Sequence, residues 1–125
     1  MISFSHSGSF DKTEQMLKSM KKKDSKAILD KYGKKGVDVL RVNTPVDTGL
    51  TSESWNYEIH SSKNRYELVW TNSNVKNGIS VAILIQYGHG TKNGGYVSGI
   101  DFINPALAPI FDQMADEVWR EVTGK

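Results

Sequence analysis

The sequence contains no cysteine and only three prolines in 125 residues. The absence of cysteine excludes disulfide bonds and thiolate catalysis, and it is expected of a cytosolic product that works without oxidation. The longest uncharged apolar run, VAILI at 81–85, is far too short to cross a bilayer. The amino terminus, MISFSHSG, lacks the basic start and the long apolar run of a signal peptide. We therefore expect a protein that is neither exported nor held in a membrane.

What the chain does contain is typical of one folded domain, which we place at 1–125. Apolar residues make up 38% and charged residues 24%, and there is no internal repeat or linker. The net charge is only +2, but residues 1–42 carry ten Lys or Arg against five Asp or Glu, and residues 43–125 carry six against nine. A basic half (+5) and an acidic half (−3) leave three interpretations open: nucleic-acid binding, solvated helix faces, or head-to-tail association of copies.

Helical periodicity dominates the first third of the chain. Apolar residues at 3–4 spacings predict helices over about 10–22 and 24–42. Gly33 and Gly36 each cost about 1 kcal/mol relative to Ala inside a helix, so they predict a point where the second helix breaks or bends. Pro45 ends this helix, because the residue before a proline is pushed out of the α region.

The clearest predicted helix closes the chain. Asn104 is its expected cap and Pro105 its first helical residue, where the missing N–H costs nothing. Gly124 follows its end. Its apolar stripe, which Trp119 could extend, consists of Leu107, Ile110, Phe111, Met114, Val118 and Val122.

The middle of the chain has strand character. Alternating apolar residues predict a hairpin of strands over 55–60 and 65–70, joined by a loop at 61–64, and a short strand is possible at 2–5. Lys76-Asn77-Gly78 reads as a turn, whereas SVAILIQY (80–87) fits a buried strand or a short helix equally well. The predicted fold class is α+β: one antiparallel sheet packed against the N-terminal and C-terminal helices.

The triplet Asp47-Thr48-Gly49 raises the possibility of a dimeric aspartic protease, in which each subunit supplies one Asp. Three features argue against it: a helix rather than a strand precedes the triplet, the large Leu50 follows it, and no second supporting element is found. A structural interpretation explains every residue. Gly49 allows a turn with positive φ, and Asp47 or Thr48 can hydrogen-bond freed backbone amides.

No other pattern predicts catalysis, a cofactor or a metal site. The run GHGTKNGG (88–95) is expected to be a loop, and it lacks both the Walker pattern and the strand–loop–helix context of a phosphate site. His6, His60 and His89 are scattered without metal-ligand spacing, and no nucleophile is placed beside His89 by any motif. The residues alone therefore favour a non-enzymatic binding or assembly module.

Three segments in this order resemble a family of small tail-associated proteins of long-tailed bacteriophages. They are PVDTGL with a following serine (Pro45 to Ser52), IQYGHGT (Ile85 to Thr91) and DFINPA (Asp101 to Ala106). The matching residues are Pro45, Asp47, Thr48, Gly49, Tyr87, Gly88, His89, Gly90 and Thr91, together with Asn104 and Pro105 at the helix start. The sequence departs from the common pattern at Leu50, which comes one place early, and at Gln86, where many members have Glu.

The resemblance implies a non-enzymatic virion protein that acts in tail completion or head–tail joining at the neck. It implies no cofactor, and it places the protein in the virion and, during assembly, in the host cytoplasm. The expected partners are other copies in a ring (a hexamer that matches the tail), other neck and tail proteins, and genomic DNA in passing. Loops 43–51 and 88–99 would make these contacts, with Lys92 near the phosphate backbone. The alternative is a nucleic-acid-binding regulator that uses the Lys-rich N-terminal helices.

Overall fold

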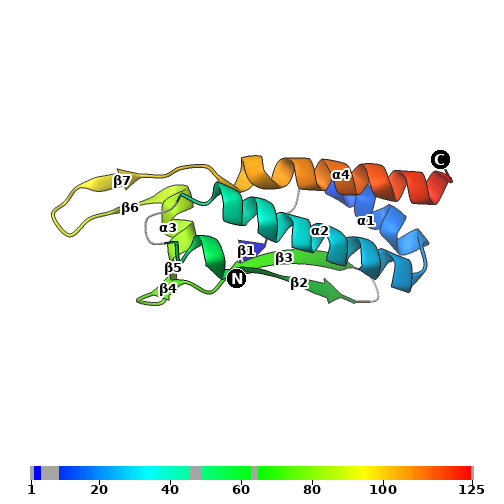
Figure 1. The fold of residues 1–125 in the computed structure, drawn as a ribbon, viewed down its shortest axis with the longest axis horizontal. Helices are drawn as coiled ribbons and strands as arrows, with labels where there is room; N and C mark the ends of the chain where they lie inside the picture. Colours follow the sequence, from blue (N-terminus) through cyan, green and yellow to red (C-terminus); the bar gives the residue numbers. More distant parts are fainter. Residues whose placement is uncertain (1, 4–8, 46–48, 63–64, 125) are drawn as a thin grey trace.

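The protein is a two-layer α+β domain, as the sequence predicts (Figure 1). The computed structural model describes residues 2–3, 9–45, 49–62 and 65–124, with side chains from Thr13 onward. One layer holds the helices α1 (Ser9–Ser19), α2 (Lys22–Asn43) and α4 (Ile103–Thr123). The other is an antiparallel sheet of order β1-β3-β2, built from β1 (Ile2–Ser3), β2 (Trp55–Ser61) and β3 (Tyr66–Asn72).

The predicted hairpin is confirmed, and its register explains where the core lies. Tyr57 pairs with Trp70 and Ile59 with Leu68, so these four side chains share the face that the helices cover. Trp70 is fully buried, and its ring meets that of Phe111 from α4 edge-on at 5.8 Å. The sheet and the C-terminal helix therefore share one hydrophobic core.

The two glycines of α2 do not break the helix, one of the two outcomes that the sequence predicted for them. α2 runs without interruption from Lys22 to Asn43. A Cβ on Gly33 would lie 2.3 Å from the Tyr57 ring, and a Cβ on Gly36 would lie 2.4 Å from the ring of Trp70. The glycines let the helix axis approach the sheet closely, and the packing gained offsets their low helix propensity.

The start of α4 is also corrected. The helix begins at Ile103, with Phe102 in the capping position, so Asn104 and Pro105 are its second and third residues. Pro105 is still tolerated, because the first four N–H groups of a helix have no partner within it. Gly124 follows the helix in a left-handed conformation, as expected.

The predicted stripe of α4 is buried from Leu107 to Val118. Trp119 and Val122 are exposed instead, at 55% and 42% of their surfaces. The buried members are Leu107, Ile110, Phe111, Met114 and Val118.

Shorter elements gather at one end of the molecule, on the left of Figure 1. They are the 3₁₀ turn Ser52–Ser54, β4 (Val75–Lys76), β5 (Ile79–Ser80), α3 (Val81–Tyr87), β6 (Gly88–Gly90) and β7 (Tyr96–Ser98). The ambiguous segment 80–87 is thus a short helix from Val81 onward, with Ser80 at the end of β5. The Asn77-Gly78 turn is confirmed, with positive φ at both residues between β4 and β5.

The run 88–95 is only partly the loop that the sequence predicts. Its first three residues form β6, which pairs antiparallel with β7. No helix in the described part of the chain is long and apolar enough to span a membrane.

Candidate interaction site

The three segments that carry the phage-family resemblance lie at this end of the molecule, and tertiary contacts link each to the next. The link from the first segment begins at Thr44, directly before Pro45. The buried Thr44 hydroxyl donates to the Leu40 carbonyl at 2.5 Å and accepts from Trp55 Nε1 at 2.8 Å. These bonds complete the end of α2 and attach it to the start of β2.

The turn after Pro45 has the backbone that its glycine predicts. Gly49 has φ of 85°, a region that residues with a Cβ rarely adopt. Asp47 and Thr48 lie outside the described residues, so their predicted role in bracing the turn stays a prediction. The Ser52 hydroxyl donates to the Gly49 carbonyl at 2.9 Å.

A small cavity of about 170 Å³ joins the first segment to α3. On one side, its lining comes from the turn at Pro45 and Gly49. On the other side, it comes from Val81 and Ile85 of α3. Thr51, also in the lining, is held by two amide side chains, because Asn74 donates to its hydroxyl at 2.7 Å and Asn72 to its carbonyl at 2.9 Å. The first two segments of the resemblance therefore face each other across one hollow.

Gln86 joins the second segment to the third. Its side chain is buried, and Oε1 accepts from the backbone N–H groups of Phe102 and Ile103 at 3.1 and 3.0 Å. Its Nε2 donates to Asp101 Oδ1 at 2.7 Å, and the same oxygen accepts from Asn104 Nδ2 at 3.0 Å. Gln86 thus caps α4 from a distant part of the chain, since it satisfies N–H groups that the helix itself leaves free.

Aromatic packing closes the circuit between the third segment and the first. The Trp55 ring, which is tied to Thr44, meets the Phe102 ring edge-on at 6.4 Å. Both rings are buried. The end of α2, the end of α3 and the start of α4 are therefore one packed unit.

From this unit the second segment projects as a hairpin arm, which we define as residues 87–100 (Figure 1). Glycines are required at its base, since a Cβ on Gly88 would lie 2.4 Å from the Val97 carbonyl oxygen, and Gly88 has φ of 80°. Thr91 closes the tip: its N–H donates to the Gly95 carbonyl at 2.9 Å, and its hydroxyl accepts from Gly95 N–H at 3.0 Å. His89 lies on β6 and is exposed.

The arm exposes large apolar side chains that have little cover from the rest of the domain. Tyr87, Tyr96, Val97 and Ile100 are each exposed over about half or more of their surface, at 63%, 66%, 47% and 54%. Exposed apolar groups clustered on a projecting element are typical of an interaction surface.

The helix layer shows how the uneven charge is arranged. α2 carries seven Lys or Arg against three Asp, a balance of +4, and α4 carries one Arg against four acids, a balance of −3. The two helices pack side by side, and Glu117 of α4 accepts from Lys31 Nζ at 2.5 Å and from the Tyr32 hydroxyl at 2.9 Å. Part of the charge asymmetry is therefore neutralised within one copy.

This contact shifts two pKa values. Burial and the hydrogen bond to Glu117 raise the pKa of Tyr32 to about 12. Burial acts to raise the pKa of Glu117, but the hydrogen bonds from Lys31 and Tyr32 outweigh it and hold this pKa below its ordinary value.

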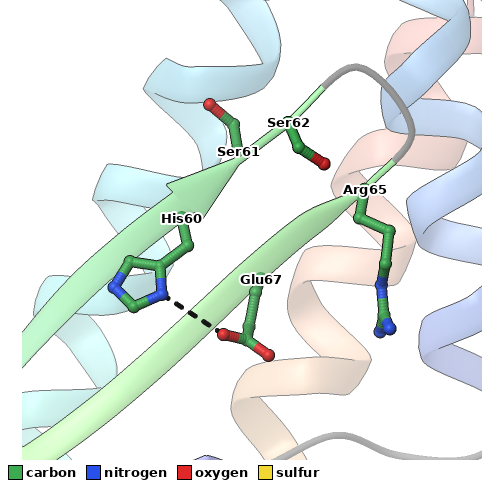
Figure 2. A pocket seen from close by; sticks show the side chains of 5 residues that line it. All are labelled: His60, Ser61, Ser62, Arg65 and Glu67. Carbon is green, nitrogen blue, oxygen red and sulfur yellow. Dashed lines mark hydrogen bonds and ion pairs between the residues drawn. The ribbon is translucent and has the colours of Figure 1, made fainter.

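A second hollow, of about 210 Å³, lies at the free end of the β2–β3 hairpin (Figure 2). His60 Nδ1 lies 3.3 Å from Glu67 Oε1 on the neighbouring strand, and Arg65 Nε lies 4.0 Å from Glu14. Ser61 and Ser62 complete the lining, but neither hydroxyl is directed at the imidazole in Figure 2. The arrangement is an exposed cross-strand polar pair rather than a nucleophile–base pair.

Searches against protein-family models, curated proteins and solved structures find no significant match to this chain.

Two features of the structure, one in the interaction site and one at the far end of α4, do not follow from the sequence. The capping role of Gln86 depends on a contact 16 residues away, and the sequence shows this residue only as a departure from the family pattern. The exposure of Trp119 runs against its place beside an apolar stripe. The sequence gives one sign of this exposure. Trp119 directly follows Val118, and two adjacent helical residues point in different directions, so a stripe that holds both is wider than one buried helix face.

Proposed function

We propose that this protein is a structural, non-enzymatic component of a bacteriophage virion that assembles with copies of itself at the neck or tail top. The observation that carries the proposal is the arm, an element that projects from the domain and exposes four large apolar side chains. A hairpin of two three-residue strands is marginal on its own, so contact with another protein surface would stabilise it.

The resemblance to tail-completion and head–tail joining proteins supports the same function. Its three segments, remote in sequence, lie at one end of the fold and are linked through Thr44, Trp55 and Gln86. Segments that form a motif for structural reasons are expected to pack together in the fold, and these three segments do so. The resemblance gives the biological setting, and the arm gives the means of association.

Self-association is tested by measuring molar mass by light scattering and sedimentation over a wide concentration range. We expect a concentration-dependent rise towards a closed ring, which for a hexamer is about 84 kDa, six times the 14.0 kDa of the chain. Repeating the measurement at high salt separates electrostatic from apolar contacts, because salt screens exposed charges. A strictly monomeric protein at every concentration would contradict self-assembly.

The setting is tested by gene neighbourhood and by localisation. Portal, capsid and tail-tube genes beside the coding sequence, and the protein in purified virions at the neck, are the expected results. A neighbourhood of metabolic or regulatory genes would refute the phage assignment while leaving self-association to be judged by its own measurement.

The outer face of α2 favours a second candidate, nucleic-acid binding. Lys34 and Lys35 are exposed on this helix, and the excess of basic residues is only partly offset by the Lys31–Glu117 pair. Phosphate contacts would make binding fall steeply with salt. A duplex-DNA shift assay tests this: the double variant Lys34→Gln/Lys35→Gln should weaken the shift, and no binding by the wild-type protein at low salt would eliminate the candidate.

A further inference from the structure

We propose that the arm of one copy docks on a groove of a second copy, which we call the Trp119 groove and define by Gln15, Met16, Ser19 and Trp119. The inference rests on the self-assembly proposed above and names its two contact surfaces. The interface is heterologous, since each copy offers an arm to one neighbour and a groove to another.

The arm carries an apolar side chain on each of its two faces. His89 pairs with Val97 and Gly90 with Tyr96, so Val97 and Tyr96 lie on opposite faces of the hairpin. The Tyr96 hydroxyl donates to the Tyr87 carbonyl at 2.9 Å, which fixes its ring along the glycine-lined strand β6. A held aromatic ring loses little conformational freedom on binding. The free side chain of Val97 on the other face completes an apolar wedge.

The Trp119 groove is the matching concave surface. It lies between α1 and α4, has a volume of about 550 Å³, and exposes 55% of Trp119. Val122, one turn further along α4, is exposed over 42% of its surface. The lining combines an exposed tryptophan with one methionine, Met16, and both residue types are enriched in protein interfaces.

The two surfaces lie at opposite ends of the long axis of the molecule. In Figure 1 the arm extends at one end, whereas Trp119 belongs to the last turns of α4, which end at the C-terminus on the other side. An arm therefore meets the Trp119 groove of a different copy. Repetition of this contact gives a head-to-tail series, which closes into a ring if the rotation per copy permits.

Charge favours the same pairing. Lys92 at the tip is the single Lys, Arg, Asp or Glu within residues 87–100. Asp112 and Asp116 are exposed and lie seven and three residues before Trp119, so they share its side of α4. A docked arm brings its positive tip towards this acidic side, and the attraction orients the encounter.

Cross-linking tests the contact directly, because the chain has no cysteine of its own. Val97→Cys and Ser19→Cys place one thiol on the arm and one in the groove. With a short bismaleimide, we expect a covalent dimer from a mixture of the two variants, and little from either variant alone. Preferential linkage of Val97→Cys to itself would show an arm-to-arm contact and overturn the proposal.

Complementation of two defective variants gives an independent test. Val97→Asp damages only the arm and Trp119→Asp only the groove, so each should raise the dissociation constant for self-association at least tenfold. A 1:1 mixture retains one intact arm and one intact groove, and it should form dimers that do not grow further. Val42→Asp is the matched control, since Val42 is 72% exposed on α2 and belongs to neither surface. Circular dichroism checks that all three variants remain folded.

The outcomes separate this inference from the proposed function. If the wild-type protein self-associates but neither Val97→Asp nor Trp119→Asp weakens it, the arm–groove contact is wrong and self-assembly stands. If the mixture of the two variants stays monomeric although the wild type assembles, the contact is likewise wrong. If the wild type is monomeric throughout, both fail.

Discussion

The substitution Gly36→Ala should destabilise this protein, although the same change normally stabilises a helix. In an unconstrained helix interior, alanine is favoured over glycine by about 1 kcal/mol. At position 36 the added Cβ would lie 2.4 Å from the ring of Trp70, which is fully buried and also packed against Phe111. The ring therefore has no free space into which it can move.

The magnitude follows from three contributions. Overpacking a core by one methyl group costs about 2 kcal/mol. Displacing the Trp70 ring weakens the hydrogen bond from its Nε1 to the Gly33 carbonyl, now 3.0 Å, for about 1 kcal/mol more. Subtracting the helix gain of about 1 kcal/mol leaves a net loss of about 2 kcal/mol, or about 8 °C in Tm for a domain of this size.

Urea unfolding followed by tryptophan fluorescence measures the change, and Ala27→Gly on the exposed side of the same helix is the control. Ala27→Gly should cost about 1 kcal/mol because glycine has the lower helix propensity. Ala27→Gly and Gly36→Ala are opposite changes on the same helix, and both should destabilise the protein. In a Trp70→Leu background, Gly36→Ala should cost much less, because the clashing ring is gone. An increase in stability for Gly36→Ala in the wild-type background would refute the reasoning.

Four further predictions concern the links around the interaction site and the helix layer. Gln86→Leu should lower the free energy of unfolding by about 2 kcal/mol, because two buried N–H groups at the start of α4 lose their acceptor. Gln86→Glu keeps the acceptor oxygens but would set a carboxylate against Asp101, so Leu and Glu are compared at position 86 in an Asp101→Asn background; an equal loss for both by urea unfolding would argue against capping. Thr44→Val should cost about 1–3 kcal/mol, because it leaves the buried Trp55 N–H unpaired; unchanged unfolding and near-UV circular dichroism would count against that bond. Glu117→Gln should cost up to about 1 kcal/mol at neutral pH, and this difference should vanish in strong acid. The lowered pKa of Glu117 means that its contribution is present above its unfolded pKa near 4.5 and is lost as the pH falls through the folded value, so a difference that persists in strong acid would contradict it. The contribution of the Tyr32 hydroxyl depends on pH in the opposite direction. Its pKa is raised to about 12, so its stabilising contribution is present below pH 10 and is lost as the pH rises through 12. An alkaline titration of the Tyr32 hydroxyl checks this pKa.

Much of the candidate site could be named from the sequence, but its organisation could not. The positive φ at Gly49 and the Asn77-Gly78 turn follow from residue type alone, since few residues other than glycine and asparagine adopt such conformations. The hairpin arm was predicted as a loop, because short glycine-rich strands have no apolar alternation. Its pairing becomes evident only when β7 is placed beside β6.

For the helices, too, local sequence patterns predicted the positions, whereas contacts with distant residues decided the details. Periodicity located α2 and α4 within a few residues, because each has an apolar stripe that any core would bury. The start of α4 was misplaced, since Gln86 rather than a neighbouring residue satisfies its first N–H groups. Residues 81–87 form a helix because of the tertiary contacts around them, since a short apolar run fits a strand or a helix equally well.

The sequence by itself determined the α+β class, the hairpin over 55–70 and the end of α2 before Pro45. These depend on interactions within a few residues of the chain, which a pattern records directly. Only the tertiary structure decided that Gly33 and Gly36 serve helix–sheet packing, that Gln86 joins two remote segments, and that Trp119 stays exposed opposite the arm. Each of these depends on which surfaces the folded chain brings together and which it leaves uncovered, and that is a property of the whole domain rather than of any local stretch.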